Sequence, residues 1–152
     1  MIIKIIRRPP KQGDGKTRVR GFAALLHYHD RHESELYHTE NIIGNTPLEL
    51  AQYFMDVSTR SSSRVKDPVF HAVISFAYNE VDPTPEVIES MARQYLQKMG
   101  YVNQPWAMYR HTDKQHIHYH IISSRVDVRS GKAISSSYEG LRTKTCLLYT
   151  SP

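Results

Sequence analysis

The sequence predicts an α/β sandwich, in which one mostly antiparallel sheet packs against helices that lie mainly on one face. Three observations carry this prediction. β-Branched and aromatic runs alternate with segments of helical periodicity, the last two such runs are separated only by a short polar turn, and no internal repeat is present. A chain of 152 residues with 39% hydrophobic and 23% charged residues fits one domain of ordinary globular composition.

The first half of the chain is expected to hold one strand and two helices. Residues 1–8 have the composition of a short strand, and residues 18–30 have that of a helix. The sequence Thr46-Pro47-Leu48-Glu49 is a capping box with proline at the first helical position, which predicts a helix over 47–58. A polar linker, STRSSSRVKDP, follows at 58–68.

The second half is expected to hold a buried strand, a helix and a β-hairpin. The helix has apolar residues at helical spacing and a closing glycine, and the hairpin has the polar turn TDKQ between its strands. These elements are expected at 69–77, from Thr84 to Gly100, and at 104–111 and 116–126, with a last short strand after a turn at 130–132.

The end of the chain differs in character from the rest. CLLYTSP (146–152) has no periodic relation to the hydrophilic, helix-like SYEGLRTKT before it, and it resembles a reading frame of a sequencing adapter. Residues 1–145 are therefore expected to form one domain that is truncated at its C-terminus, and 146–152 a non-native read-through tail. The single cysteine, Cys146, excludes an internal disulfide framework and a cysteine-based zinc ribbon.

Charge and hydropathy point to a cytoplasmic protein with a polyanionic partner. No stretch approaches 18 apolar residues, and MIIKIIRRPP is too short and too soon charged for a signal peptide. Of the net charge of +5, the basic excess lies in residues 1–20, and the remainder is nearly balanced. Such an arm is either a solvated terminus or a phosphate-binding surface. Its basic residues are Lys4, Arg7, Arg8, Lys11, Lys16, Arg18 and Arg20.

Four histidines lie within ten residues, at 111, 116, 118 and 120. Side chains alternate along a strand, so the last three share one face while Ile117, Tyr119 and Ile121 point to the other. A row of imidazoles is costly to bury without partners. The pattern therefore favours a site over an ordinary core.

Strand geometry selects the expected metal ligands. The Cα atoms of His116 and His120 are roughly 13 Å apart at about 3.3 Å per residue, too far for both rings to share one ion comfortably. His111 returns across the hairpin turn to the pair at 118 and 120. We expect His111, His118 and His120 to bind a divalent ion, Mg²⁺ or Mn²⁺, with His116 as an outer partner or substrate contact.

Two families share this histidine pattern. The seven residues HIHYHII match the signature of histidine-triad nucleotide hydrolases and transferases. The longer pattern His111-x-Asp113-x-x-His116-x-His118-x-His120 resembles the third motif of the relaxase/mobilisation nuclease family, of MobA type, within the HUH endonucleases. An early tyrosine after a helical segment, VFHAVISF, EVDPTPE and GYVNQPWAMYRH extend this resemblance over most of residues 1–135.

The relaxase resemblance implies a palm-like HUH fold and a tyrosine that nicks one DNA strand. Tyr28 is the expected nucleophile and Tyr37 the alternative. His27 and His29 flank Tyr28, but helical neighbours point elsewhere, so neither is expected to act in the site. An aryl oxide leaves more readily than a sugar alkoxide, which keeps the covalent 5′-phosphotyrosine linkage reversible.

Other polar residues are candidates around this site. His71 and Ser75 share one face of the VFHAVISF strand and are candidates to contact DNA phosphate, although Ser75 is equally a core-packing residue. Glu80 and Asp113 are candidates to orient a metal-bound histidine, although Asp113 is equally a turn former.

Three functions remain open at this point. The first is a bacterial, cytoplasmic relaxase that acts on single-stranded DNA at a transfer origin, with accessory mobilisation proteins and no membrane partner. The second is a metal-free histidine-triad enzyme, and the third a non-catalytic DNA-binding module.

Overall fold

The computed structural model describes residues 1–6, 21–26, 29, 34–60, 65, 67–77, 80–112 and 117–149. Residues 21–26 are helical. The other elements, in chain order, are β1 (Ile2–Ile5), β2 (Ser34–Glu40), α2 (Pro47–Thr59), β3 (Val69–Ser75), α3 (Pro85–Lys98), β4 (Trp106–His111), β5 (His118–Ser124) and α4 (Glu139–Tyr149).

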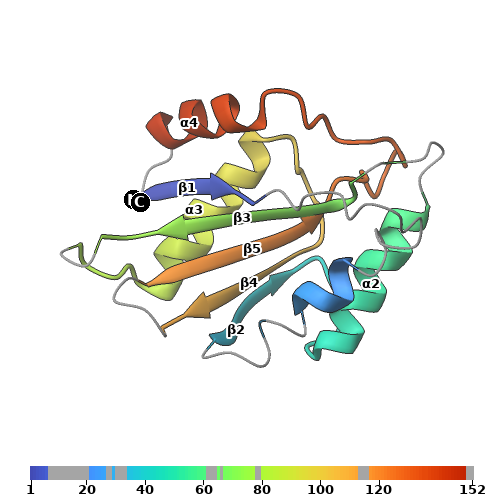
Figure 1. The fold of residues 1–152 in the computed structure, drawn as a ribbon, viewed down its shortest axis with the longest axis horizontal. Coiled ribbons are helices and arrows are strands. Elements are labelled where there is room, and N and C mark those ends of the chain that lie inside the picture. The colour runs from blue at the N-terminus through green and yellow to red at the C-terminus, as the bar shows by residue number, and fades with distance from the viewer. Residues whose placement is uncertain are drawn as a thin grey trace.

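The five strands form one sheet in the order β1-β3-β5-β4-β2, and every neighbouring pair is antiparallel (Figure 1). The predicted α/β sandwich with an antiparallel sheet is therefore confirmed. The predicted hairpin is also present as β4 and β5, with Trp106 opposite Ser123 and His111 opposite His118. The last short strand is reduced to one bridge between Val126 and Ala133.

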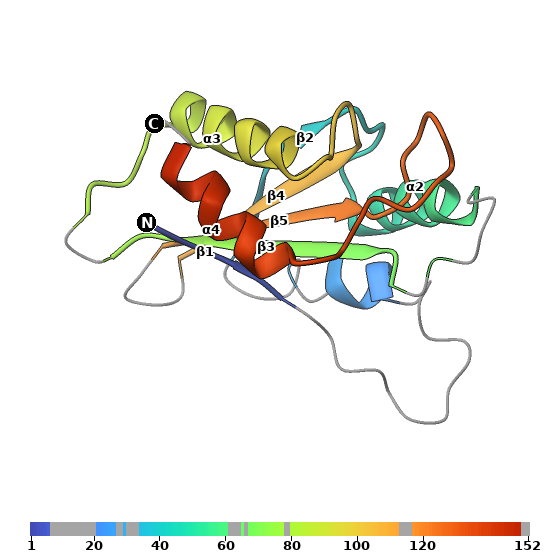
Figure 2. The ribbon, with the colours of Figure 1, turned by 90° about the horizontal axis from the view of Figure 1, so that it is seen from above.

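Helices cover both faces of the sheet, whereas the sequence predicted them mainly on one. Helices α3 and α4 lie on the first face, and the helical turn at 21–26 lies on the opposite side (Figure 2). On this second face α2 and residues 21–26 enclose a smaller core of their own. Its fully buried members are Phe22, Leu26, Leu50, Phe54, Ala107 and Ile122. No helix among the described residues is long and apolar enough to cross a bilayer.

The two long helices begin where the sequence predicted, because a threonine caps each of them. The Thr46 hydroxyl accepts a hydrogen bond from the Glu49 backbone N–H and donates one to the Glu49 carboxylate. The Thr84 hydroxyl accepts from the Val87 N–H in the same way. Gly100, at φ 96°, follows α3 in the left-handed conformation that glycine tolerates best.

Strand β2 was not predicted, and its local structure explains why. It lies at the edge of the sheet, and the register slips between Leu36 and His38 so that Tyr37 is an extra residue. The bulge interrupts the period-two alternation. Leu36 packs with the α2 core, whereas Tyr37 packs with the α3 core. A polar edge strand with a broken alternation leaves no apolar pattern to detect.

Helix α4 is tied to the sheet by a buried ion pair. Arg125 donates from Nε and Nη2 to the two carboxylate oxygens of Glu139, at 2.9 and 3.0 Å, and both side chains are buried. The helix continues past the expected break at 146, and the Cys146 side chain packs into the α3 core. That residues 146–152 are non-native stays a prediction.

Candidate active site

Three strands place polar side chains on one face of the sheet, which we call the histidine face. Opposed residues of an antiparallel pair point to the same side. His120 lies opposite Tyr109 on β4 and Val73 on β3, while His118 lies opposite His111 and Ser75. Tyr119, between the two histidines, is fully buried in the core on the α3 side. The predicted alternation along this strand is confirmed.

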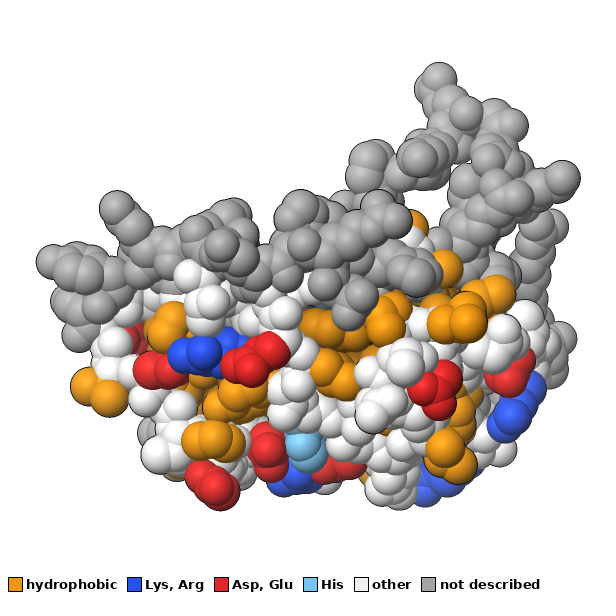
Figure 3. All heavy atoms as spheres, turned by 90° about the horizontal axis from the view of Figure 1, so that it is seen from below, with side chains coloured by type: hydrophobic (Ala, Val, Ile, Leu, Met, Phe, Trp, Pro, Cys, Tyr) orange, Lys and Arg blue, Asp and Glu red, His pale blue; other side chains and the backbone are white. Residues whose placement is uncertain are grey.

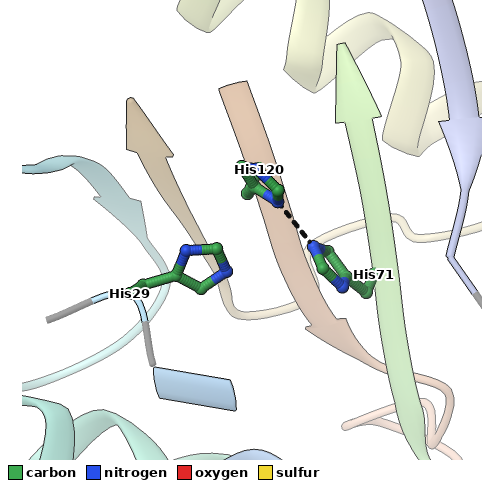
Figure 4. A group of neighbouring side chains, drawn as sticks. All are labelled: His29, His71 and His120. Atoms are coloured by element: carbon green, nitrogen blue, oxygen red, sulfur yellow. Dashed lines mark hydrogen bonds between the residues drawn. The ribbon is translucent and has the colours of Figure 1, made fainter. Parts of the chain in front are cut away.

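Three histidines from distant segments converge on this face (Figure 4). One ligand nitrogen from each of His29, His71 and His120 lies within 4.8 Å of the other two. His71 Nε2 is 2.8 Å from His120 Nδ1. His29 and His71 are buried and His120 is half-buried. The group thus joins the segment after residues 21–26, strand β3 and strand β5.

A fourth imidazole, from His111, adjoins this group. His111 Nε2 lies 2.6 Å from His29 Nδ1, and the His111 ring centroid is 4.4 Å from that of His120. The Tyr109 ring stacks on His29 with 5.0 Å between centroids. We call His29, His71, His111 and His120 the imidazole cluster.

The imidazole cluster has a donor set that fits a divalent ion. Two nitrogens bonded to one ion at about 2.1 Å are roughly 3.0–3.4 Å apart for right-angle to tetrahedral geometry. The contacts of 2.6 and 2.8 Å within the cluster are hydrogen-bond distances, somewhat shorter than that spacing, so a bound ion would move the paired nitrogens slightly apart. Neutral imidazoles are good ligands for first-row transition metals and leave the ion its full charge.

His118 lies beside the cluster and is held by the neighbouring strand. Its Nδ1 is 2.9 Å from the Ser75 hydroxyl. Ligating histidines commonly bind the metal through one ring nitrogen and hydrogen-bond through the other. Ser75, a candidate DNA contact from the sequence, is thus in contact with a histidine ring, and its role at the DNA stays a prediction. His71, also expected at the DNA, lies inside the cluster. The triad of His111, His118 and His120 stays a prediction.

Several predicted site residues fall outside the part of the chain that is described. These are Tyr28, Asp113 and His116, together with Arg7, Arg8, Lys11, Lys16, Arg18 and Arg20 of the basic arm. Lys4 is described and is exposed on the edge strand β1, opposite Val73. Because Val73 is in turn opposite His120, Lys4 belongs to the histidine face.

Among the described residues, Glu80 contacts the N-terminus of the chain rather than a histidine. Its carboxylate accepts hydrogen bonds from the Met1 amino group at 2.8 and 3.0 Å and from the Ala77 N–H at 3.0 Å. These bonds lower the pKa of Glu80. The residue therefore anchors the N-terminus of β1.

Tyr37 lies on the other side of the sheet from the imidazole cluster. Its ring packs edge-on against Tyr119, with 5.6 Å between centroids. Burial raises the pKa of the Tyr37 hydroxyl, which disfavours the phenolate. This placement separates the alternative nucleophile from the histidines by the thickness of the sheet.

His29 is the residue that sequence reasoning missed. It was set aside because helical neighbours of Tyr28 point away from it. The available signal was the spacing Phe22, Leu25, Leu26 and His29, which places the histidine on the apolar stripe of the helix. In the structure His29 is fully buried, as that spacing requires.

The opposite face carries charged networks, and His38 joins one of them through Glu40 and Glu89. Arg110 donates to Asp82 at 2.8 Å, and the Tyr119 hydroxyl donates to the same carboxylate at 2.6 Å. Burial and this contact raise the pKa of Tyr119. Nearer the β2 edge, Arg93 binds Glu40 through two nitrogens, and this lowers the pKa of Glu40 to about 2.

The side of the molecule shown in Figure 3 mixes acidic, basic and apolar side chains. No single sign of charge dominates the coloured surface there. Long-range attraction of a polyanion needs a surface of one sign. The described residues on this side therefore do not form a surface of one charge sign.

Comparison with known proteins agrees with the sequence motifs. Residues 26–147 match the family model described as "Relaxase: MobA/VirD2-like, nuclease domain". Two curated relatives from Staphylococcus aureus, both called Protein rlx, are 40% identical over 68 residues and 35% identical over 72 residues. These matches cover 44% and 47% of this chain but only 21% of each relative, so the chain spans about a fifth of their length. With the family model covering most of the sequence, the chain belongs to the MobA/VirD2-like relaxase nuclease-domain family.

Proposed function

We propose that this chain nicks single-stranded DNA by transesterification, with Tyr28 as nucleophile and a divalent ion bound at the histidine face. The observation that carries the proposal is the convergence of imidazoles from distant segments around His120. The family match supports a nuclease, and it favours the relaxase over the histidine-triad hypothesis.

The residues proposed to hold the ion are His111, His118 and His120. His111 and His120 have adjacent rings, and the Ser75 contact at Nδ1 of His118 is the kind that fixes a ligand binding through Nε2. When bound, Mg²⁺ or Mn²⁺ would neutralise charge on the non-bridging phosphate oxygens.

In the proposed reaction the Tyr28 oxygen forms a bond to phosphorus as the bond to the 3′-oxygen breaks. The phenolic proton is lost and the 3′-oxygen gains a proton, so the products are a 5′-phosphotyrosine and a free 3′-hydroxyl. Supporting this assignment, Tyr28 directly precedes His29, whose ring lies in the imidazole cluster. The 3′-hydroxyl of a strand end can reverse the step, forming its bond to phosphorus as the tyrosine oxygen leaves, because a phenolate is a good leaving group.

DNA contacts are proposed for the basic arm and the histidine face. Lys4 lies two strands from His120, which is about 10 Å at the usual strand spacing. That distance suits a phosphate next to the scissile one. The biological role that follows is initiation of conjugative plasmid mobilisation at a transfer origin in the bacterial cytoplasm, with accessory mobilisation proteins.

The test uses labelled single-stranded DNA that carries the cognate origin, with Mn²⁺. We expect a covalent protein–DNA adduct in wild type and none in Tyr28→Phe, because the substitution removes only the attacking oxygen. Tyr37→Phe is the matched control and should form adduct at the wild-type level. An adduct of undiminished yield in Tyr28→Phe would refute the assigned nucleophile. DNA binding without any nick in wild type would favour the non-catalytic module.

A further inference from the structure

We propose that His29 is an additional ligand of the same ion, so that metal binding fixes the position of Tyr28. This inference rests on the proposed function and adds a residue that lies outside the histidine motif at 111–120. No sequence motif assigns a role to His29; the proposal comes from its surroundings in the fold.

His29 lies at the centre of the imidazole cluster. Its ring centroid is 4.5 Å from that of His120, 4.8 Å from His111 and 5.8 Å from His71. Figure 4 shows the ring directed toward His71 and His120. The side chain is fully buried. A residue placed only for packing would not need to converge its nitrogens on three other imidazoles.

The individual contacts bring His29 nitrogens close to those of the neighbouring imidazoles. His29 Nδ1 is 2.6 Å from His111 Nε2, and a ligand nitrogen of His29 lies within 4.8 Å of those of His71 and His120. Stacking on Tyr109 holds the ring plane. An imidazole that is already oriented loses little rotational freedom when an ion binds.

The consequence concerns the chain segment from 21 to 29. Its helical turn is packed by Phe22, Leu25 and Leu26 against α2 and the sheet. A bond from His29 to the ion would fix the other end of the segment. Tyr28 is the residue directly before His29, so one peptide unit would link the proposed nucleophile to a ligand of the ion. The nucleophile and the ion would then be held close together. Such proximity accelerates the displacement at phosphorus.

The test measures Mn²⁺ affinity directly, by calorimetry and by the electron paramagnetic resonance signal of the bound ion. His29→Phe keeps an aromatic ring against Tyr109 but loses both nitrogens, and we expect its affinity for Mn²⁺ to fall about 10- to 100-fold. His29→Gln retains a polar side-chain atom, so its affinity for Mn²⁺ should fall by less. His38→Phe is the matched control, since His38 contacts Trp106 on the α3 side, and it should bind Mn²⁺ within twofold of wild type.

A second readout tests the coupling to Tyr28. In wild type, Mn²⁺ should slow amide hydrogen exchange in residues 21–29, whereas in His29→Phe the ion should leave that exchange unchanged. Tyr28→Phe should keep both the affinity and the slowing. If either folded His29 variant, Phe or Gln, binds Mn²⁺ and responds in exchange as wild type does, the proposal is wrong. If the wild-type protein binds no Mn²⁺, the proposed function itself fails. If the wild-type protein binds Mn²⁺ and the His29 variants bind it equally well, only the role of His29 fails.

Discussion

The two faces of the β4–β5 hairpin both bury polar groups, but they do so with opposite chemistry. On the α3 side, the Arg110 guanidinium and the Tyr119 hydroxyl both donate hydrogen bonds to the Asp82 carboxylate. On the other side, imidazoles from separate segments converge on one another. A carboxylate that accepts from a cation and a hydroxyl stabilises a fold, whereas the convergent imidazoles are also the donor set of the proposed ion site.

The largest effect should come from breaking the histidine face. His120→Ala removes the ring that contacts both His71 and His111. We expect strand cleavage to fall by about 10³-fold, as when a group that stabilises transition-state charge is lost. The free energy of unfolding without metal should change by less than about 1 kcal/mol, since His120 is half-buried. Cleavage rates test the first expectation and urea unfolding tests the second. A large decrease in the free energy of unfolding would show that the ring is structural.

The converse substitution is Tyr119→Phe on the opposite face. It removes the hydrogen bond to Asp82 and keeps the packing of a fully buried ring. We expect a loss of about 1–2 kcal/mol in the free energy of unfolding, typical of a hydrogen bond to a charged group, with cleavage within twofold of wild type. The measurements are urea unfolding by circular dichroism and the nicking rate. A large loss of cleavage at unchanged stability would contradict the separation of the two faces.

The smallest effect concerns pH and the Glu40–Arg93 pair on the α3 side. The pKa of Glu40 is about 2 in the folded chain against 4.5 for an ordinary glutamate, so its contribution is present above pH 4.5 and is lost as the pH falls toward 2. Because the pair is partly exposed, we expect about 1 kcal/mol. Glu40→Gln should therefore be less stable than wild type at pH 7 but equal at pH 2. An unchanged difference at both values would exclude this ionisation as the cause.

The comparison of the faces also separates what sequence can and cannot predict. The alternation of His118, Tyr119 and His120 follows from strand geometry and was predictable. The β3 residues that contact them are set by the pairing of strands that lie far apart in the sequence. No local sequence pattern encodes that pairing. Thus the contact of Ser75 with His118 and that of His71 with His120 appeared only in the structure. Likewise β2 went undetected because its bulge at Tyr37 breaks the period of its few apolar residues.

The imidazole cluster is assembled from segments that lie far apart in the chain, and this separation determines when during folding the cluster forms. His71 and His120 are separated by 49 residues, and His29 and His111 by 82. The β4–β5 hairpin is local and can form early, but the other two histidines arrive only after long loops have closed. Loop closure between distant segments slows folding, and topologies rich in such contacts fold in milliseconds to seconds rather than microseconds. In a chain emerging from the ribosome, the imidazole cluster would therefore stay incomplete until the last strands are synthesised, and the proposed ion binding and nicking would have to wait until the sheet is whole.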